Sequence, residues 1–245
     1  MTDTETALIL GSGPDVLRSR AWPRSGLGRM VAINNAWRVR PDWDDLIHPS
    51  DFPEDRQPDS IGPDQRVRTH LDYVPAVNAH GGFVFCGGTM AFTAGYWALE
   101  ALRPRVLAFL GCDMVYASSG ASHFYGRGAP DPLREDPTLQ SLEAKSARLM
   151  MIAASIGCAV VNLSVAPTSR LVFPRLGHAA FAAGKTPVPE TFGAAVDDLR
   201  AREKALGYDV PSGKYWKEAD RFDPDALRRI DALWLDAARS YARAA

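Results

Sequence analysis

The sequence predicts an α/β fold with a Rossmann-like, doubly wound and mostly parallel sheet of about six strands. Short apolar runs of strand length alternate with amphipathic segments of helix length, which is the pattern of successive βαβ units. Apolar residues dominate each run, as expected for strands that are covered on both faces. Beyond Leu176 the pattern becomes helical. We therefore expect residues 1–180 to form the Rossmann-like domain and residues 181–245 a helical C-terminal extension.

Six apolar runs are predicted to be strands, and two segments between them are predicted to be helices. The two segments, Thr89–Leu102 and Leu139–Ile156, have apolar residues at positions i, i+3, i+4 and i+7, which favours helices that pack one face on the sheet. The predicted strands are Ala7–Leu10, Met30–Ile33, Leu46–His48, Phe83–Cys86, Val106–Leu110 and Ala159–Leu163.

Two connections are unusually long. Residues Pro49 to Gly82 contain five prolines and many charges, which predicts a surface excursion with little regular structure. Residues Asp113 to Thr138 are rich in glycine, proline and polar residues. Such a segment buries little apolar area, so we expect it to be partly disordered without a ligand.

Two helices are predicted near the C-terminus. Glu190–Leu206 ends at Gly207, which suits the left-handed position after a helix, while Asp223 and Pro224 are typical of the N-cap and first residue of another. This last helix has one apolar stripe, which includes Trp234. We expect the stripe to pack on the domain or to support self-association as a homo-oligomer.

Composition limits the class of protein. Of the 245 residues, 46% are hydrophobic and 23% charged, and the net charge is −1, which disfavours a nucleic-acid partner. The longest apolar stretch, Met150 to Val161, is shorter than the ~20 residues of a membrane span. The N-terminus, MTDTET, is too polar for a signal peptide, and the three cysteines form no CxxC pair. These features predict a cytoplasmic protein.

Two glycine turns follow predicted strands. Gly11-Ser12-Gly13-Pro14 resembles the start of a dinucleotide fingerprint, but Val16 replaces its third glycine, which disfavours NAD or FAD. The turn is either a plain tight connection or an anion site at free helix N–H groups. Gly87-Gly88-Thr89 opens a predicted helix and is expected to line the same crevice of a doubly wound sheet. The alternative is a close helix–sheet contact that needs glycine.

Polar residues end two further strands at the same predicted edge. Asn34 and Asn35 follow the second strand, and carboxamides suit recognition of a base or sugar because they both donate and accept hydrogen bonds. Turn chemistry alone also explains two asparagines. Gly111, Asp113 and Met114 follow the Val106–Leu110 strand. Asp113 is either a ligand for a ribose hydroxyl, a metal or an N–H group, or a turn former.

The long loop after Asp113 carries Tyr116, His123 and Tyr125. A histidine beside a nucleotide crevice is suited to general base catalysis because its pKa lies near neutral pH. A lone loop histidine is also common as plain surface, and His48 at the end of a predicted strand is a rival. The sequence contains no metal-binding motif, so we predict no metal.

A set of short motifs occurs in one order along residues 6–175. The set is Gly11-Ser12-Gly13-Pro14, Asn35, Gly87-Gly88, Gly111-Cys112-Asp113, the loop with His123, and Pro167-Thr168-Ser169-Arg170-Leu171. It resembles the bacterial lipooligosaccharide sialyltransferases. Residues 87–116 also look like the related domain of motility-associated glycosyltransferases and of the archaeal hydroxymethylpterin pyrophosphokinase. All of these share a Rossmann-like nucleotide-binding core.

The resemblance implies roles for individual residues. Ser12 and Asn35 would contact a cytidine nucleotide, Gly88 and Thr89 would lie along its sugar or phosphate, and His123 would deprotonate an acceptor hydroxyl. The family has tyrosines before its histidine that stabilise the leaving phosphate. Here Tyr116 lies one residue later than the expected place and residues 117–122 contain no second tyrosine, which leaves Tyr125 as the substitute.

The function predicted on this basis is a sialyltransferase-like transfer of a sugar from a CMP-linked nucleotide-sugar donor to the hydroxyl of a glycan or other acceptor. The resemblance implies no metal and no other cofactor. One alternative is a pyrophosphokinase of a pterin-like alcohol, which would need ATP and magnesium to neutralise the phosphate charge. Another is a non-catalytic nucleotide-binding protein of the same fold.

Overall fold

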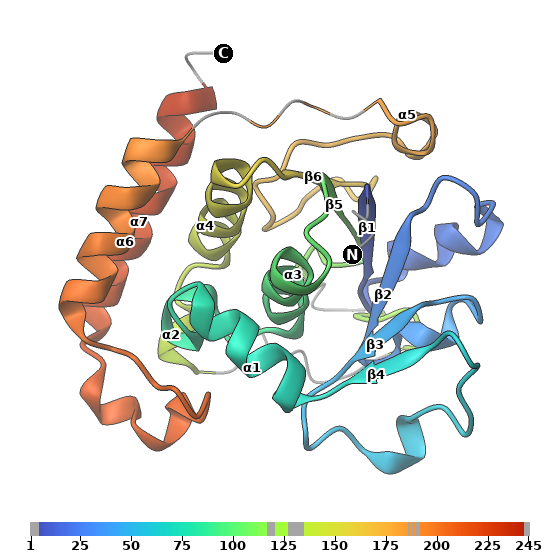
Figure 1. The fold of residues 1–245 in the computed structure, drawn as a ribbon, viewed down its shortest axis with the longest axis horizontal. Coiled ribbons are helices and arrows are strands. Elements are labelled where there is room, and N and C mark those ends of the chain that lie inside the picture. Colours follow the sequence, from blue (N-terminus) through green and yellow to red (C-terminus); the bar gives the residue numbers. More distant parts are fainter. Residues whose placement is uncertain are drawn as a thin grey trace.

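The structure is a computed structural model, and it describes residues 5–116, 121–126, 135–185, 187, 189 and 192–242. Its centre is a six-stranded sheet in the order β4-β3-β2-β1-β5-β6, in which every neighbouring pair is parallel (Figure 1). The predicted α/β fold with a Rossmann-like parallel sheet is confirmed. The strands are β1 (Thr6–Leu10), β2 (Arg29–Ile33), β3 (Asp45–Ile47), β4 (Arg66–Arg68), β5 (Val106–Leu110) and β6 (Ala159–Asn162).

Successive residues of the central strands enter two separate cores. In β1, Ala7 and Ile9 pack with the helices on one face, whereas Leu8 and Leu10 belong to the cluster on the other face. All four side chains are fully buried. This double burial explains why the strand is a continuous apolar run and not an alternating one.

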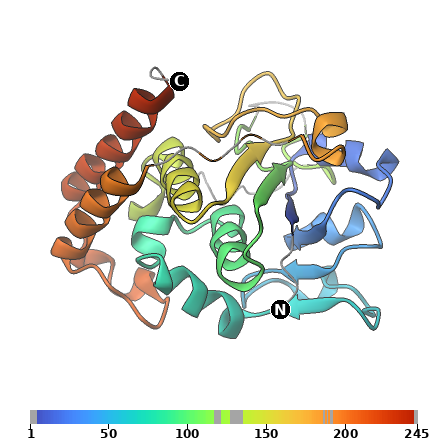
Figure 2. The ribbon, with the colours of Figure 1, turned by 45° about the horizontal axis from the view of Figure 1, so that its top comes forward.

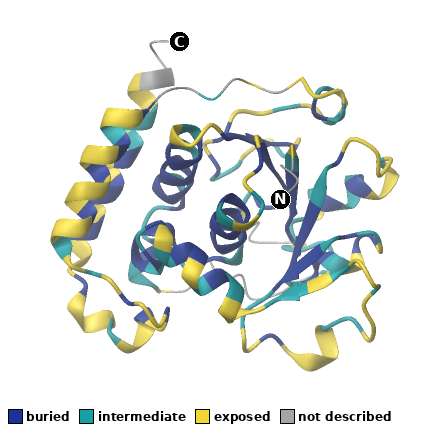
Figure 3. Ribbon diagram, viewed as in Figure 1, coloured by how far each residue is buried: buried dark blue, intermediate teal, exposed yellow. Residues whose placement is uncertain are grey.

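Helices cover the two faces unequally. Figure 1 shows α1 (His70–Ala79), α3 (Met90–Ala101) and α4 (Leu142–Ser155) on one face, with short helical turns and α5 (His178–Ala182) on the other. α6 (Gly193–Leu206) and α7 (Pro224–Ala242) form a further layer outside α4 (Figure 2). Figure 3 shows that α3 and α4 are buried on nearly all sides. The short turns are η1 (Pro14–Ala21), η2 (Asn34–Arg38), η3 (Glu54–Arg56), η5 (Pro137–Leu139), η6 (Tyr215–Lys217) and η7 (Ala219–Arg221).

The strand prediction for Phe83–Cys86 is wrong, because this segment is the short helix α2. A four-residue apolar run has no periodicity that separates a strand from a buried helical turn. The residues before and after it, Gly82 and Gly87, have positive φ values of 83° and 87°, which end the helix on both sides and keep it out of the sheet.

The prediction of little regular structure between Pro49 and Gly82 is also wrong, because β4, α1 and the short η3 lie within it. β4 is an edge strand with two arginines in three residues, so it lacks the apolar signal of the inner strands. Its Arg68 pairs with the buried Asp45 of β3 at 2.7 Å. α1 begins at a capping box between Thr69 and Asp72, which stabilises the helix start despite the later proline.

The helix predictions near the C-terminus are confirmed. Gly207 adopts the left-handed conformation after α6, and Asp223 Oδ1 accepts a hydrogen bond from the Asp225 N–H at 2.8 Å. The apolar stripe of α7 packs within the chain, where Trp234 is fully buried, so that tryptophan is not a surface for self-association. Among the described residues, no helix is long and apolar enough to cross a membrane.

Candidate functional site

A cleft of about 1330 Å³ opens at the carboxyl ends of the strands. Its floor is formed where β1 and β5 lie side by side, because the chain leaves these two strands in opposite directions across the sheet. This switch point is where open α/β sheets bind ligands. Of the predicted site residues, the cleft is lined by Gly11, Ser12, Gly13, Asn34, Asn35, Gly88, Thr89, Gly111, Asp113, Met114, Tyr116, His123 and Tyr125.

The two turns on the floor of the cleft pack directly on one another. The N–H of Gly13 donates to the Gly111 carbonyl at 2.8 Å, and the N–H of Gly11 donates to the Leu110 carbonyl at the same distance. A Cβ atom at Gly11 would lie 2.3 Å from the Gly111 oxygen, and one at Gly13 would lie 2.8 Å from it. These glycines are therefore required by the contact between the turns, whether or not a ligand is bound.

Asn34 and Asn35 begin η2 directly after β2, at the wall of the cleft. Asn34 has a φ of +52°, a left-handed conformation that asparagine tolerates better than most residues. The Asn35 side chain is only 4% exposed. Within the described residues, the Oδ1 atoms of both asparagines are buried without a hydrogen-bond partner. Such atoms are costly in a protein interior, so an acceptor without a partner on a residue of the cleft wall is a candidate contact for a ligand.

The start of α3 lies on the opposite wall of the cleft. Thr89 is the N-cap, and its hydroxyl accepts a hydrogen bond from the Phe92 N–H. The Gly88 N–H donates to the Thr138 hydroxyl at 3.0 Å. Gly87 does not line the cleft, and a Cβ there would lie 3.0 Å from the Lys145 Cγ atom. Its role is the close packing of α2 and α3 on α4, the alternative already open from the sequence.

Asp113 is held by the strand beside it. Its carboxylate accepts hydrogen bonds from Asn162 Nδ2 at 3.1 Å and from the Ser164 hydroxyl at 2.5 Å. Its carbonyl accepts from the Arg170 N–H at 2.9 Å. These bonds fasten the end of β5 to the loop after β6, which supports a structural role for the side chain.

His123 lies in a tight turn that is fastened to the first glycine turn. Its N–H and carbonyl bond to Gly126, and the next residue, Phe124, donates its N–H to the Ser12 carbonyl at 2.9 Å. The His123 ring centroid is 5.0 Å from that of Tyr125 and 5.9 Å from that of Tyr116. The structure thus groups the three predicted catalytic residues. The expected disorder of the connection falls largely on residues 117–120 and 127–134, which lie outside the described residues.

The hydrogen bond at the His123 ring indicates which nitrogen could accept a proton. His123 Nδ1 lies 2.8 Å from the Ser122 hydroxyl oxygen. In the tautomer in which Nδ1–H donates to that oxygen, Nε2 carries the lone pair of the neutral ring. The rival His48 is not among the residues that line the cleft, although it contacts two that are: its Nδ1 lies 2.9 Å from the Pro49 carbonyl and its ring packs on Phe52.

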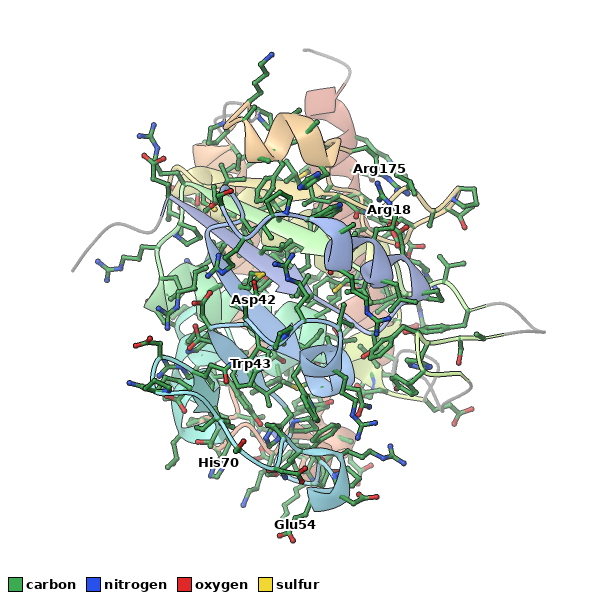
Figure 4. All side chains as sticks on the ribbon, turned by 90° about the vertical axis from the view of Figure 1, so that its right-hand side faces the viewer. Arg18, Asp42, Trp43, Glu54, His70 and Arg175 are labelled. Carbon is green, nitrogen blue, oxygen red and sulfur yellow. The ribbon has the colours of Figure 1, made fainter. Side chains whose placement is uncertain are left out.

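Arg18 is a cleft residue that the sequence analysis did not single out. It projects from η1, and its Nη1 atom lies 3.4 Å from both an Asp15 carboxylate oxygen and the Leu163 carbonyl. Arg175 donates at 2.5 Å to the carbonyl of Ser164, the residue after Leu163, and both arginines are labelled in Figure 4. Arg18 is 38% exposed in its side chain and places a cation near the turn after β1.

The C-terminal part of the chain also reaches the cleft. Residues Ser212 to Trp216, between α6 and α7, line one wall. The Tyr215 hydroxyl donates to the Asp136 carboxylate at 2.8 Å, and Asp136 also accepts from the N–H and the hydroxyl of Thr138. No periodicity in the sequence indicates this contact, because it joins two irregular segments 79 residues apart.

The described residues contain no group of three or more histidine, cysteine, aspartate or glutamate side chains arranged to hold a metal ion.

Cys112 lines the cleft, but burial raises the pKa of its thiol well above the usual value, so the protonated thiol is not a nucleophile at neutral pH. The groups suited to chemistry are therefore the carboxamides, the arginine and the His123 cluster.

Fold and site together define an α/β protein with a Rossmann-like sheet and a large cleft at its switch point. Comparison with protein-family models, curated proteins and solved structures finds no match. The argument for function therefore starts from the residues of the cleft.

Proposed function

We propose that the protein is a glycosyltransferase that moves a sugar from a CMP-linked donor to an acceptor hydroxyl. The observation that carries the proposal is Asn35, a buried carboxamide at the end of β2 whose Oδ1 has no partner among the described residues. The end of the second strand is where nucleotide-binding α/β folds contact the nucleoside. After a rotation of the carboxamide toward the cleft, a nucleoside would supply the N–H or hydroxyl donor that this oxygen lacks.

Three neighbours of Asn35 support the assignment. The turn after β1 and the start of α3 both line the cleft at helix starts, which are positions that suit a phosphate, although the N–H groups of Gly11, Gly13 and Gly88 already have protein acceptors. Arg18 adds a positive charge beside the first turn. The motif order resembles that of the sialyltransferases, which is the reason for choosing a CMP-linked donor over other nucleotide sugars.

In the proposed reaction, the bond between the anomeric carbon and the phosphate oxygen breaks, and CMP leaves with the electron pair. The acceptor oxygen forms the new bond to the anomeric carbon and loses its proton to His123 Nε2. Tyr116 and Tyr125, packed beside the His123 ring, are assigned to the departing phosphate. A general base in this position typically accelerates transfer by ~10²–10⁴-fold.

Isothermal titration with CMP, CDP, UDP, GDP and ATP tests the nucleotide part of the proposal. CMP is expected to bind, and Asn35→Ala is expected to weaken binding by about 10- to 100-fold, equivalent to one or two lost hydrogen bonds. The same variant is expected to be at least as stable as the parent in urea unfolding, because it removes a buried acceptor that has no partner.

The two measurements together separate a binding role from a structural one. Loss of stability together with binding would make Asn35 a folding residue. Failure of all five nucleotides to bind would remove the proposal. Magnesium-dependent binding of ATP in preference to CMP would instead favour the pyrophosphokinase alternative.

A further inference from the structure

The cleft is larger than one small ligand needs. Single-ligand pockets usually measure ~300–1,000 Å³, and this cleft measures about 1330 Å³. The residues assigned to the nucleotide lie around the ends of β1, β2 and β5 and the start of α3. A second group of lining residues, from α1, α2 and the segment before α7, lies outside that assignment and forms what we call the aromatic arm: Tyr73, Phe83, Tyr215 and Trp216.

The rings of the aromatic arm are in mutual contact. The Phe83 and Tyr215 rings are stacked with centroids 6.0 Å apart, and Tyr73 meets Phe83 edge to face at 6.5 Å. Trp216 packs edge to face on Tyr215 at 5.5 Å. The hydrogen bond from Tyr215 to Asp136 fixes the position of this group. The arm is therefore a preorganised wall and not a set of separate surface side chains.

Trp216 differs from the tryptophans that serve the core. It is 62% exposed, whereas Trp43, Trp97 and Trp234 are each at most 4% exposed. An exposed indole among the lining residues of a cleft offers a flat apolar face to a ligand. Ser212 and Lys214, exposed in the same stretch of lining, add a hydroxyl and an ammonium donor. Flat apolar surface next to polar donors matches a sugar ring, which has a C–H face and a rim of hydroxyl groups.

We infer that the aromatic arm is a second subsite that binds a hexopyranose, with the C–H face of the ring on Trp216 and its hydroxyls toward Ser212 and Lys214. The inference rests on the proposed function, in which this sugar is the acceptor. It extends that proposal by assigning the acceptor class to a segment of the chain beyond the sheet. An alkyl chain would pack on the aromatic face but would not use the neighbouring hydrogen-bond donors. The test must therefore distinguish a bound sugar ring from a bound alkyl chain.

Nuclear magnetic resonance of the ¹⁵N-labelled full chain tests the inference. The indole N–H signal absent from Trp216→Phe identifies Trp216. Titration with methyl β-D-galactopyranoside and methyl β-D-glucopyranoside is expected to shift that signal, and saturation transfer is expected to reach the ring C–H protons. Mannitol, which has hydroxyls but no ring face, is expected to shift nothing.

Substitutions of Trp216 then test whether its side chain contacts the sugar. Trp216→Ala is expected to weaken sugar binding by about tenfold or more, a loss equal to about 1.4 kcal/mol, while Trp216→Phe keeps part of it. Leu233→Ala, an equally conservative loss of exposed apolar surface on α7, is the matched control and is expected to change nothing. Affinity for CMP is expected to be the same in all three variants.

The outcomes distinguish this inference from the proposed function. If CMP binds and neither pyranoside shifts the Trp216 signal, the subsite is overturned and the nucleotide proposal stands. If no nucleotide binds but the pyranosides shift Trp216, the sugar subsite stands without the transfer reaction. Saturation of the alkyl chain of octyl β-D-glucopyranoside without its ring protons overturns the inference in favour of an apolar ligand.

Discussion

Arg148 in α4 and Glu203 in α6 form a buried bidentate ion pair, with two nitrogen–oxygen distances of 2.7 Å. Arg148 also donates to the Tyr96 hydroxyl of α3 at 2.7 Å, and Trp234 of α7 donates to Glu203 at 2.8 Å. Although burial opposes the charge, Glu203 keeps the pKa of Arg148 above its ordinary value. One pair thus ties both C-terminal helices to the core, and with them the segment that carries Trp216.

Glu203→Gln is expected to destabilise the protein strongly. Removing one partner of a buried pair leaves an uncompensated charge, which typically costs ~3–5 kcal/mol. Urea unfolding followed by circular dichroism measures the loss. The control is Asp198→Asn on the same helix, because the Arg202–Asp198 pair is 56% and 59% exposed and such pairs contribute at most ~1 kcal/mol.

A double variant tests the cause of this loss. Replacing both Arg148 and Glu203 by methionine removes the charge together with its partner, so it is expected to cost less than Glu203→Gln alone. A loss in the single variant no larger than in the Asp198 control would show that the buried pair does not hold the C-terminal helices.

Gly11→Ala is expected to destabilise the fold even without a ligand. Its Cβ would lie 2.3 Å from the Gly111 carbonyl oxygen, a backbone atom that cannot move without shifting the end of β5. Overpacking of this kind typically costs ~1–3 kcal/mol. Gly193→Ala at the start of α6 meets nothing within 4 Å and has no positive φ. It is expected to stabilise by up to ~1 kcal/mol. Thermal unfolding of both variants measures these changes in stability, and equal melting temperatures would contradict the prediction.

Much of the fold is predictable from the sequence because five strands are buried on both faces and therefore read as apolar runs. The edge strand β4 is not predictable in this way, because its Arg68 is paired with Asp45 on the neighbouring strand, a contact that no local pattern shows. The sequence pattern also does not show that two charged residues of α4 are buried. In the sequence, Lys145 and Arg148 resemble a solvent-exposed helix face. Their buried partners, Asp231 and Glu203, come from distant parts of the chain.

The site was predictable in part for a similar reason. Parallel strands end at one edge, so the residues after β1, β2 and β5 were expected to lie at the same edge once the sheet was predicted to be parallel, and the structure has them there. The role of each residue depends on its contacts with other parts of the chain, which the sequence does not show. Asp113 is engaged by Asn162 and Ser164, and the glycines of the first turn are required by Gly111. Tyr215 reaches the cleft through a contact between two irregular segments, which sequence periodicity cannot indicate.

The cysteines are expected to be unreactive in the folded protein. Burial raises the pKa of Cys86 to about 11 and that of Cys158 to about 12. A thiol with a raised pKa is protonated below that pKa, so the reactive thiolate is scarce at pH 8. Modification with Ellman's reagent at pH 8 is expected to be slow in buffer and rapid for all three cysteines in urea. Rapid labelling of one thiol in buffer would identify a local opening and contradict the buried positions.

His123→Ala is expected to separate catalysis from binding. The proposed reaction assigns the imidazole to the acceptor, whereas it assigns the nucleotide to Ser12, Asn35 and the start of α3. Affinity for CMP is therefore expected to stay within a few-fold of the parent, while transfer from CMP-sialic acid to lactose falls by at least ~10²-fold. The loss is expected at every pH at which the parent transfers, including above pH 8, because alanine cannot accept a proton.

His48→Ala is the matched control for that experiment, because His48 packs on the cleft residue Phe52 but is not itself among the residues that line the cleft. It is expected to retain transfer, with any loss of stability checked by thermal unfolding. If His123→Ala retains transfer, the base lies elsewhere, and the contact of the Phe124 N–H with Ser12 serves only to position the loop. If both variants bind CMP tightly and neither they nor the parent turn over the donor, the cleft is a nucleotide-binding site without transfer. The two assays together therefore test the chemistry separately from the fold and from nucleotide recognition.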